Sequence, residues 1–348
     1  MASFRRHPER KRPVSAILGP VAPAEHLRPE QINAEQLSAE QLSAEQIGRA
    51  LRTFWRRTPD RCVAIRTGLH SCTWQVDVGD EHFAAKVMPA GMRAQMEAGM
   101  FAADRLERDG FSAGRPVRAV DGALTVPVER AAVGLLTWVP GRALVAADGL
   151  DQQWWGDTLG AAHKRLHGLT HPGLVRFQPL RVEAAHLDVE PWVRPAVAGA
   201  VASAKKRSVT DQLTYGVLHG DPAPDAFRLD PTSGRTGLVD WGLAAIGPLA
   251  YDIASAVMYA GGIAAADQLI EAYLAAGPVP EEELDAALPS MLRLRWAVEA
   301  DYAAHRLAAD LAAGVLERPG DRAPLHLARD ALGALDRAER AAARDDPD

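Results

Sequence analysis

The chain has 348 residues and a net charge of −6, with 47% hydrophobic and 24% charged residues. These proportions are ordinary for a soluble globular protein, and the length exceeds one average domain, so we expect two lobes. The acidic balance gives no reason to expect nucleic acid or a membrane as a partner, and no apolar run reaches the roughly 18 residues of a membrane span. Two cysteines, Cys62 and Cys72, are too few for a disulfide framework and predict reduced thiols in a cytoplasmic protein.

Residues 1–48 are expected to form an arm that is disordered or folds only with a partner. Residues 29–48 repeat a five-residue unit, PEQIN, AEQLS, AEQLS, AEQIG. A five-residue step turns about 140° around a helix, so the repeats form no single apolar face. They fit a tolerant linker or, alternatively, a docking segment. Ser43 and Gln46 have the spacing of a capping box, which predicts a helix running on through LRTFW.

Residues 49–139 are predicted to form a small sheet with one helix. Strand-like patterns occur in CVAIRTG, SCTWQVDVG, EHFAAKVM, ALTVPVE and AVGLLTWV. Between the third and fourth of these, RAQMEAGMFAADRLERDG has the pattern of a helix that ends at Gly110.

Residues 140–348 are predicted to be mainly helical, including two long helices between about 288 and 344. The exception is a pair of β-like runs, TYGVLHGD and TGLVD, which end at Asp221 and Asp240. The fold class is therefore α+β, a sheet lobe followed by a larger helical lobe. Ligands commonly bind between two such lobes.

Five features follow one another along the chain and fit one kind of chemistry. A glycine turn with hydroxyl residues, GLHSCT, contains Gly68 and Ser71. A lysine, Lys86, interrupts an apolar strand, and Glu97 follows on the next helix. Each of these features alone is weak, because glycine turns and helical glutamates are common.

The two aspartates are more specific. One carboxylate can accept a proton from an attacking hydroxyl, and the other can hold a divalent cation. Phosphoryl transfer needs this division of labour, because it consists mainly of positioning and charge neutralisation. Mg²⁺ prefers oxygen ligands, which suits a carboxylate.

These motifs resemble the aminoglycoside phosphotransferase and choline kinase family, which has a bilobal protein-kinase-like fold. The resemblance covers about residues 50–310, and it depends on His219-Gly220-Asp221, on Val239-Asp240-Trp241-Gly242 and on the helix start Tyr251-Asp252-Ile253-Ala254. It implies an enzyme that uses ATP or GTP with Mg²⁺.

The resemblance also implies roles for individual residues. Asp221 would be the catalytic base and Asp240 a metal ligand. Lys86 would contact the nucleotide phosphates, and Glu97 would orient Lys86. Gly68 and Ser71 would lie in the nucleotide-binding turn, and the backbone of Thr137, Trp138 and Val139 would read the adenine.

The chain departs from the family pattern at Ala226, where the family has an asparagine that binds a second metal ion. A methyl group cannot bind a metal. Asp225, one residue earlier, offers a carboxylate in its place, but the loop would then have to follow a different path. If nothing replaces the asparagine, catalysis is weak or absent.

Other patterns favour structural roles. His163 and His167 stand four residues apart on a helix, but Lys164 takes the place of the glutamate of a zinc motif, so we expect core or capping histidines. Trp154, Trp155 and Leu159 are expected in the core. The acidic run at residues 281–285 fits the start of a helix.

The acceptor is the least predictable part. A hydroxyl of a small molecule, aminoglycoside-like or an amino alcohol, comes first. The alternatives are a Ser or Thr hydroxyl of a precursor peptide, and a nucleotide-binding pseudokinase that acts as a scaffold. Acidic residues of the helical lobe would suit a cationic acceptor: Asp148, Asp151, Asp157 and Asp252. The sequence does not indicate an oligomeric state.

Overall fold

The computed structural model of the protein describes residues 42–67, 71–210, 212–312, 314–315 and 320–345. Most of the predicted arm and of its repeats therefore lies outside the described residues. In the described part no helix is both long and apolar enough to cross a bilayer.

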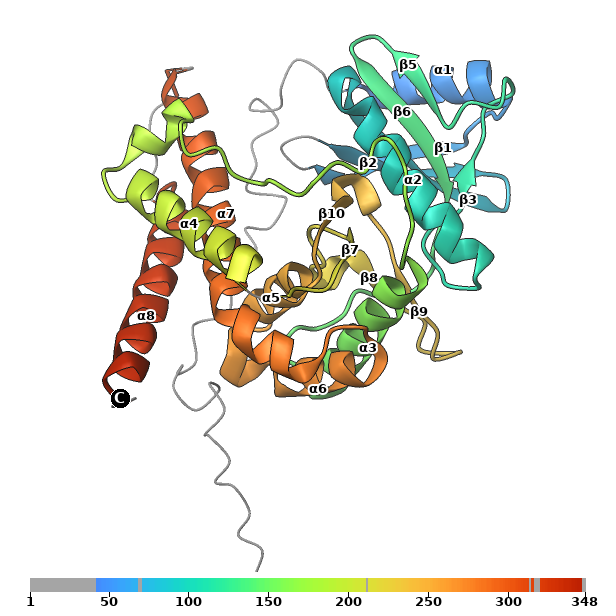
Figure 1. Cartoon of the computed structure of the whole chain (residues 1–348). Coiled ribbons are helices and arrows are strands. Elements are labelled where there is room, and N and C mark those ends of the chain that lie inside the picture. Colours follow the sequence, from blue (N-terminus) through green and yellow to red (C-terminus); the bar gives the residue numbers. More distant parts are fainter. Residues whose placement is uncertain (1–41, 68–70, 211, 313, 316–319, 346–348) are drawn as a thin grey trace, which may run out of the picture.

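A small antiparallel sheet forms the N-terminal lobe, with the strand order β1-β2-β3-β6-β4 and with β5 also paired to β6 (Figure 1). Its strands are β1 (Arg61–Thr67), β2 (Cys72–Val78), β3 (Glu81–Pro89), β4 (Pro116–Val117), β5 (Thr125–Val128) and β6 (Ala131–Thr137). The five predicted strands are confirmed. The two-residue strand β4 was not predicted, because so short a run carries no alternation.

Two helices cover the two faces of this sheet. Helix α1 (Ala44–Trp55) begins at the predicted Ser43–Gln46 capping box, which is confirmed. It buries Ile47 and Leu51 against side chains of β3 and β6. The predicted arm boundary at residue 48 thus falls inside a helix of the sheet lobe.

Helix α2 (Arg93–Arg108), preceded by η4 (Ala90–Met92), lies on the other face. Its Met96 and Met100 pack on Met88 of β3. Side chains alternate along a strand, so Lys86 points to the same face of β3 as Met88 and away from α1. The alternation therefore directs Lys86 to the α2 side of the sheet.

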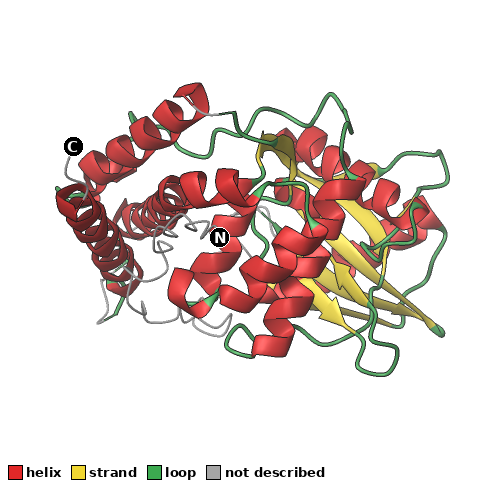
Figure 2. Cartoon of the chain, turned by 60° about the horizontal axis from the view of Figure 1, so that its bottom comes forward, coloured by secondary structure: helices red, strands yellow, loops and turns green. Residues whose placement is uncertain are grey.

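The C-terminal lobe is mainly helical, as predicted. Its helices are α3 (Gly149–Arg165), η5 (Ala185–Val189), α4 (Val193–Thr210), α5 (Ala250–Tyr259), η8 (Ile263–Ala265), α6 (Asp267–Ala276), α7 (Glu281–Ala312) and α8 (Ala323–Asp345). Helices α3 and α6 lie side by side below the sheet, and α4, α7 and α8 form a separate group (Figures 1 and 2). Both expected long C-terminal helices, α7 and α8, are present.

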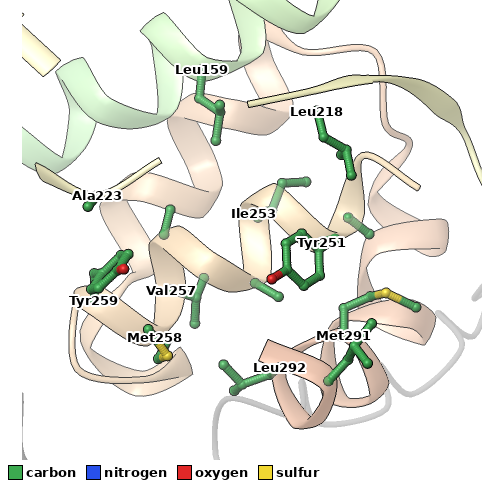
Figure 3. Close-up of a cluster of buried hydrophobic side chains, with 14 of the residues drawn as sticks. Leu159, Leu218, Ala223, Tyr251, Ile253, Val257, Met258, Tyr259, Met291 and Leu292 are labelled. Carbon is green, nitrogen blue, oxygen red and sulfur yellow. The ribbon is translucent and has the colours of Figure 1, made fainter. Parts of the chain in front are cut away.

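Helix α5 is the centre of this lobe, since all ten of its residues are buried. Figure 3 shows its Ile253 and Val257 between Leu159 of α3 and Met291 of α7. Tyr251 and Tyr259 stand at opposite ends of the helix. A helix buried on all sides is a fixed platform for the loops around it.

Those loops come from two short antiparallel ribbons. Strand β7 (Tyr215–Leu218) pairs with β10 (Ala245–Pro248), and β8 (Phe227–Leu229) pairs with β9 (Thr236–Leu238). Two 3₁₀ turns complete the region, η6 (Pro224–Ala226) and η7 (Trp241–Leu243). The predicted aspartates lie in the connections of these ribbons.

Candidate active site

The β8–β9 hairpin brings the segments of Asp221 and Asp240 side by side. Phe227 opens β8 opposite Leu238, which closes β9. Beyond this pair, the Val239 backbone N–H donates to the Ala226 carbonyl at 2.8 Å. The two aspartates, nineteen positions apart in sequence, therefore flank the same end of one hairpin.

His219 links the two segments further. Its Nε2 lies 2.8 Å from the Val239 carbonyl oxygen, which can only accept, so the ring donates. Its ring also packs against Trp241 at 4.9 Å between centroids. The histidine of the HGD motif thus connects the segment before Asp221 to the segment around Asp240.

Asp252 fixes the backbone of the HGD segment from below. Its buried carboxylate accepts hydrogen bonds from the backbone N–H groups of His219 at 2.6 Å and of Gly220 at 3.0 Å. His163 of α3 lies 3.1 Å from the same carboxylate through Nε2 and 2.8 Å from the Tyr273 hydroxyl through Nδ1. The helix α5 carboxylate therefore ties the loop of Asp221 to the core.

Asp221 is held by two side chains of the helical lobe. Its Oδ1 accepts from the Tyr259 hydroxyl at 2.6 Å and from Arg295 Nη2 at 3.2 Å. About a quarter of its side chain is exposed, 26%, so solvent or a substrate can reach it. Neither contact was anticipated from the sequence.

Asp240 forms an ion pair with Lys86. The aspartate has a left-handed backbone, with φ at 72°, at the start of η7. A Cβ atom at Gly242 would come within 3.1 Å of Lys86 Cε, so the turn of η7 fits closely around the lysine. Strand β3 and the turn η7 therefore meet at this ion pair.

Helix α2 explains why the two meet. Gly99 of α2 lies so close to η7 that a Cβ atom there would be 2.1 Å from the Trp241 carbonyl oxygen. Any larger residue would push the helix off the turn. Because α2 also packs on β3, it holds the sheet and the Asp240 turn together.

The expected ion pair between Lys86 and Glu97 is not formed in the described structure. Glu97 instead accepts from Arg93 Nε at 2.9 Å and from the Thr125 hydroxyl at 2.5 Å. Partial burial alone would raise the pKa of Glu97, but these hydrogen bonds hold it below its usual value. Lys86 pairs with Asp240 instead, because the contact of α2 with η7 brings this carboxylate of the other lobe to the lysine.

The linker between the lobes runs from β6 past Trp138 and Val139. Thr137 closes β6, and the Trp138 backbone N–H donates to the His82 carbonyl at 3.1 Å. Gly141 has a φ of 124°, and a Cβ there would be 2.8 Å from the Leu229 backbone. The linker thus lies directly against strand β8 of the β8–β9 hairpin, whose end is flanked by Asp221 and Asp240.

Gly68 lies outside the described residues, and Ser71 precedes β2 directly. Asp225 and Ala226 occupy the 3₁₀ turn η6. Successive side chains of such a turn point about 120° apart. Accordingly Asp225 is exposed, whereas Ala226 is fully buried in the helical core.

Comparison with known proteins identifies the group to which this arrangement belongs. The model of the "Phosphotransferase enzyme family" matches residues 61–288. The chain belongs to this family. Among curated protein sequences, no significant match is found.

Solved structures with the same fold include several small-molecule kinases. Amicoumacin kinase hAmiN, in complex with AMP-PNP, Ca²⁺ and Ami, aligns with a TM-score of 0.67 at 16% identity, over 86% of this chain and 96% of its own. A microcompartment-associated aminopropanol kinase aligns with a TM-score of 0.62 at 18% identity, over 82% and 93% of the two chains. A choline/ethanolamine kinase family protein from Mesorhizobium loti aligns with a TM-score of 0.60 at 16% identity, over 85% and 93%. At such identities the likeness shows the fold, which is the bilobal, protein-kinase-like fold that the motifs implied.

The residues of this phosphotransferase-family site fit a divalent cation that is bound together with phosphates. Mg²⁺ is usually held by one or two carboxylates plus phosphate oxygens and water. The part of the chain that the structure describes contains no cluster of three or more metal-binding side chains. Asp240 supplies one hard oxygen donor in contact with a cation, Lys86, so the site suits an anion–metal complex rather than a metal alone.

Several sequence-based interpretations are settled by the same packing. His163 is buried in the core network, as expected, and Trp155 and Leu159 are fully buried. Trp154 is half-buried against the core, and His167 is exposed, so the expected core position is wrong for His167. Three of the four acidic residues considered for a cationic acceptor have structural partners. Asp148 caps α3, Asp151 binds Arg142, and Asp252 holds the HGD loop.

Proposed function

We propose that this protein transfers the γ-phosphate of ATP to a hydroxyl group of a small molecule. The observation that carries the proposal is the convergence of three groups. Asp221 and Asp240 flank one end of the β8–β9 hairpin, and Lys86 of the sheet lobe contacts Asp240. Phosphoryl transfer needs a base, an oxygen ligand for the metal and a cation for phosphate within one site.

The roles follow from chemistry and position. Asp221, partly exposed, is the base that receives the proton of the acceptor hydroxyl. Asp240 holds the metal ion, and Lys86 moves from Asp240 to a phosphate oxygen when nucleotide binds. The backbone of residues 137–139 binds the base of the nucleotide, Ser71 contributes to the turn near the phosphates, and Glu97 supports the position of α2.

In the reaction the acceptor oxygen bonds to the γ-phosphorus, the bond from that phosphorus to the β,γ-bridging oxygen breaks, and ADP leaves. The hydroxyl proton passes to Asp221. When bound, Mg²⁺ neutralises charge on the phosphates. Lys86 adds a second positive charge at the same place.

Ala226 and Asp225 decide how strongly the metal is held. Ala226 supplies no oxygen ligand, and its methyl group is buried. We propose Asp225 as the second carboxylate, which requires η6 to turn its exposed side chain toward the nucleotide. If η6 keeps its path, Asp240 is the main protein ligand and turnover is slow.

The relatives suggest the acceptor class. Solved structures with the same fold include an amicoumacin kinase, an aminopropanol kinase and a spectinomycin phosphotransferase. We propose an amine-bearing alcohol, aminoglycoside-like or an amino alcohol. ATP is the proposed donor, with GTP as the alternative.

A second candidate function is a nucleotide-binding scaffold with little or no catalysis, which the buried Ala226 favours. The two are separated by measuring ADP release with Mg²⁺ over a panel of amino alcohols, aminoglycosides and Ser/Thr peptides. Turnover that depends on one small molecule supports the kinase. Phosphorylation of a peptide and of no small molecule would indicate that the acceptor is a precursor peptide. Nucleotide-induced thermal stabilisation without turnover would support the scaffold.

A further inference from the structure

A buried arginine of α7 contacts the carboxylate that we propose as the base. Arg295 has only 4% of its surface exposed. Its Nη2 lies 3.2 Å from Asp221 Oδ1 and 2.7 Å from the Tyr259 hydroxyl. The guanidinium therefore approaches the site from the protein interior and not from the solvent side.

The remaining nitrogens of Arg295 are also engaged. Nε donates to the Ser255 hydroxyl of α5 at 2.8 Å. Nη1 forms an ion pair with Glu299, one turn further along α7, at 2.5 Å but without the geometry of a hydrogen bond. Burying a guanidinium is unfavourable unless its charge is paired and its N–H groups have acceptors. Burial alone would lower the pKa of Arg295, but the surrounding acidic groups raise it, so the residue stays charged.

Tyr259 completes the arrangement. Burial raises the pKa of its hydroxyl well above the usual value, so the phenol keeps its proton. The hydroxyl donates a hydrogen bond to Asp221 Oδ1 at 2.6 Å and accepts one from Arg295 Nη2. Two donors thus converge on the same carboxylate oxygen, and each is itself held by α5 or α7.

We propose that Arg295 and Tyr259 are positioning residues that fix the orientation and the charge of Asp221 for proton transfer. This inference rests on the proposed function, because it assumes that Asp221 is the base. A carboxylate with two fixed donors on one oxygen cannot rotate freely about its χ2 angle. Its other face is thereby aimed consistently at the acceptor, which is how pre-organisation accelerates a proton transfer.

The charge around Asp221 supports a role in tuning. Two basic groups other than Arg295 lie in this region: His219 Nδ1 accepts from the Asp221 backbone N–H at 3.4 Å, and Arg306 of α7 lies over the Tyr302 ring. Arg295 is a cation in direct contact with the Asp221 carboxylate, and the acidic groups of α5 and α7 around it are phenols and carboxylates. These are Tyr251 and Tyr259 of α5, Asp252 of α5, and Glu299 and Tyr302 of α7. Removing Arg295 would leave the base among acidic groups, which favours its protonated form.

The test compares Arg295→Met, Arg295→Lys and Tyr259→Phe in the full-length protein, with the acceptor that gives turnover. We expect Arg295→Met to lower kcat about 10- to 100-fold, the loss typical of a misplaced catalytic group, with KM for ATP nearly unchanged. The acidic limb of its pH–rate profile should move to higher pH. Arg295→Lys should restore part of kcat, and Tyr259→Phe should lower kcat without moving that limb as far.

Arg293→Met is the matched control. Arg293 lies two positions earlier on α7, on the opposite side of the helix, and it pairs with Asp336 and Glu339 of α8. Its loss should lower thermal stability but leave kcat and the pH profile unchanged. A similar drop in kcat for Arg293→Met would mean that α7 acts only through folding, which would overturn the proposal.

The reference variant Asp221→Asn distinguishes a failure of the positioning role from a failure of the proposed function. If Asp221→Asn abolishes turnover and Arg295→Met retains kcat within about twofold, the proposed function stands and the positioning role is wrong. If Asp221→Asn retains full activity, the proposed function itself is wrong.

If no acceptor gives turnover, the contact between Asp221 and Arg295 can be tested through melting temperatures of the two single variants and the double variant. Asp221→Asn and Arg295→Met should shift the melting temperature non-additively, because contacting residues couple. Additive shifts would refute the contact between them and with it the positioning role.

Discussion

Lys86 and Asp240 form an ion pair that joins the sheet lobe to the helical lobe. Only 10% of the lysine side chain and 20% of the aspartate side chain are exposed. The pair places a cation of β3 on the carboxylate that we propose as the metal ligand. A bound metal–nucleotide complex would compete for both partners. The ion pair therefore neutralises both side chains until the complex binds.

The first prediction concerns the strength of this pair. A double-mutant cycle with Lys86→Met and Asp240→Asn, measured by chemical unfolding, should give a coupling of about 1–3 kcal/mol, because residues in direct contact couple on this scale. The exposed pair Arg49–Glu45, with 65% and 77% of its side chains exposed, is the control and should couple by only about 0.3–0.5 kcal/mol. Equal couplings for the two pairs would show that the lobes are not joined here.

The second prediction concerns Asp225. If it replaces the missing amide, Asp225→Ala should abolish Mg²⁺-dependent turnover while the melting temperature stays nearly unchanged, since the residue is exposed. Asp157→Ala removes an exposed carboxylate of α3 and serves as the control, with no expected loss. An unchanged rate for Asp225→Ala leaves Asp240 as the main protein ligand.

The third prediction concerns the support of the HGD loop. Asp252→Asn replaces one of two oxygens that accept from the His219 and Gly220 N–H groups, so one buried donor loses its acceptor. We expect the free energy of unfolding to fall by about 1–3 kcal/mol and kcat to fall with it. Tyr273→Phe removes only the hydroxyl on the far side of His163 and should have the smaller effect. The opposite order of effects in unfolding experiments would contradict this assignment.

The fourth prediction concerns pH and the linker. Asp151 accepts from two Arg142 nitrogens at 2.6 and 2.7 Å and from the Val145 backbone at 2.7 Å. Arg142 lowers the pKa of Asp151 below its usual 3.8, so the folded state favours the charged form. This stabilisation is therefore complete above the unfolded pKa and is lost as pH falls through the folded one.

Asp151→Asn should accordingly be less stable than the wild type at pH 7, and the difference should shrink below about pH 4. Unfolding midpoints measured from pH 7 to pH 3 check this. A difference that does not depend on pH would mean that the hydrogen bonds matter and the charge does not.

Local patterns explain what the sequence could predict. The strands of the sheet lobe alternate, the Ser43–Gln46 pair begins α1, and both motif aspartates follow short β-runs. Each of these features depends on residues close together in the chain. For that reason the fold class and the hairpin that brings Asp221 near Asp240 could be anticipated.

The partners of the site residues could not be anticipated in the same way. Glu97 was the expected partner of Lys86, but the approach of Gly99 to Trp241 gives the lysine Asp240 instead. Arg295 stands in an apolar stretch of α7, MLRLRWAV, that also contains Arg293, so the local sequence does not show which arginine is buried at the site. Its partner lies 74 positions away, and only tertiary packing brings the two together.

The most direct test of the central claim is phosphoryl transfer by Asp221→Asn, beside the wild type, with ATP, Mg²⁺ and the acceptor that supports turnover. Nucleotide binding is followed in parallel by thermal shift. We predict that the variant binds nucleotide like the wild type but transfers phosphate at least about 100-fold more slowly, because it lacks the base. Undiminished transfer by Asp221→Asn would contradict the assignment of Asp221 and with it the proposed mechanism.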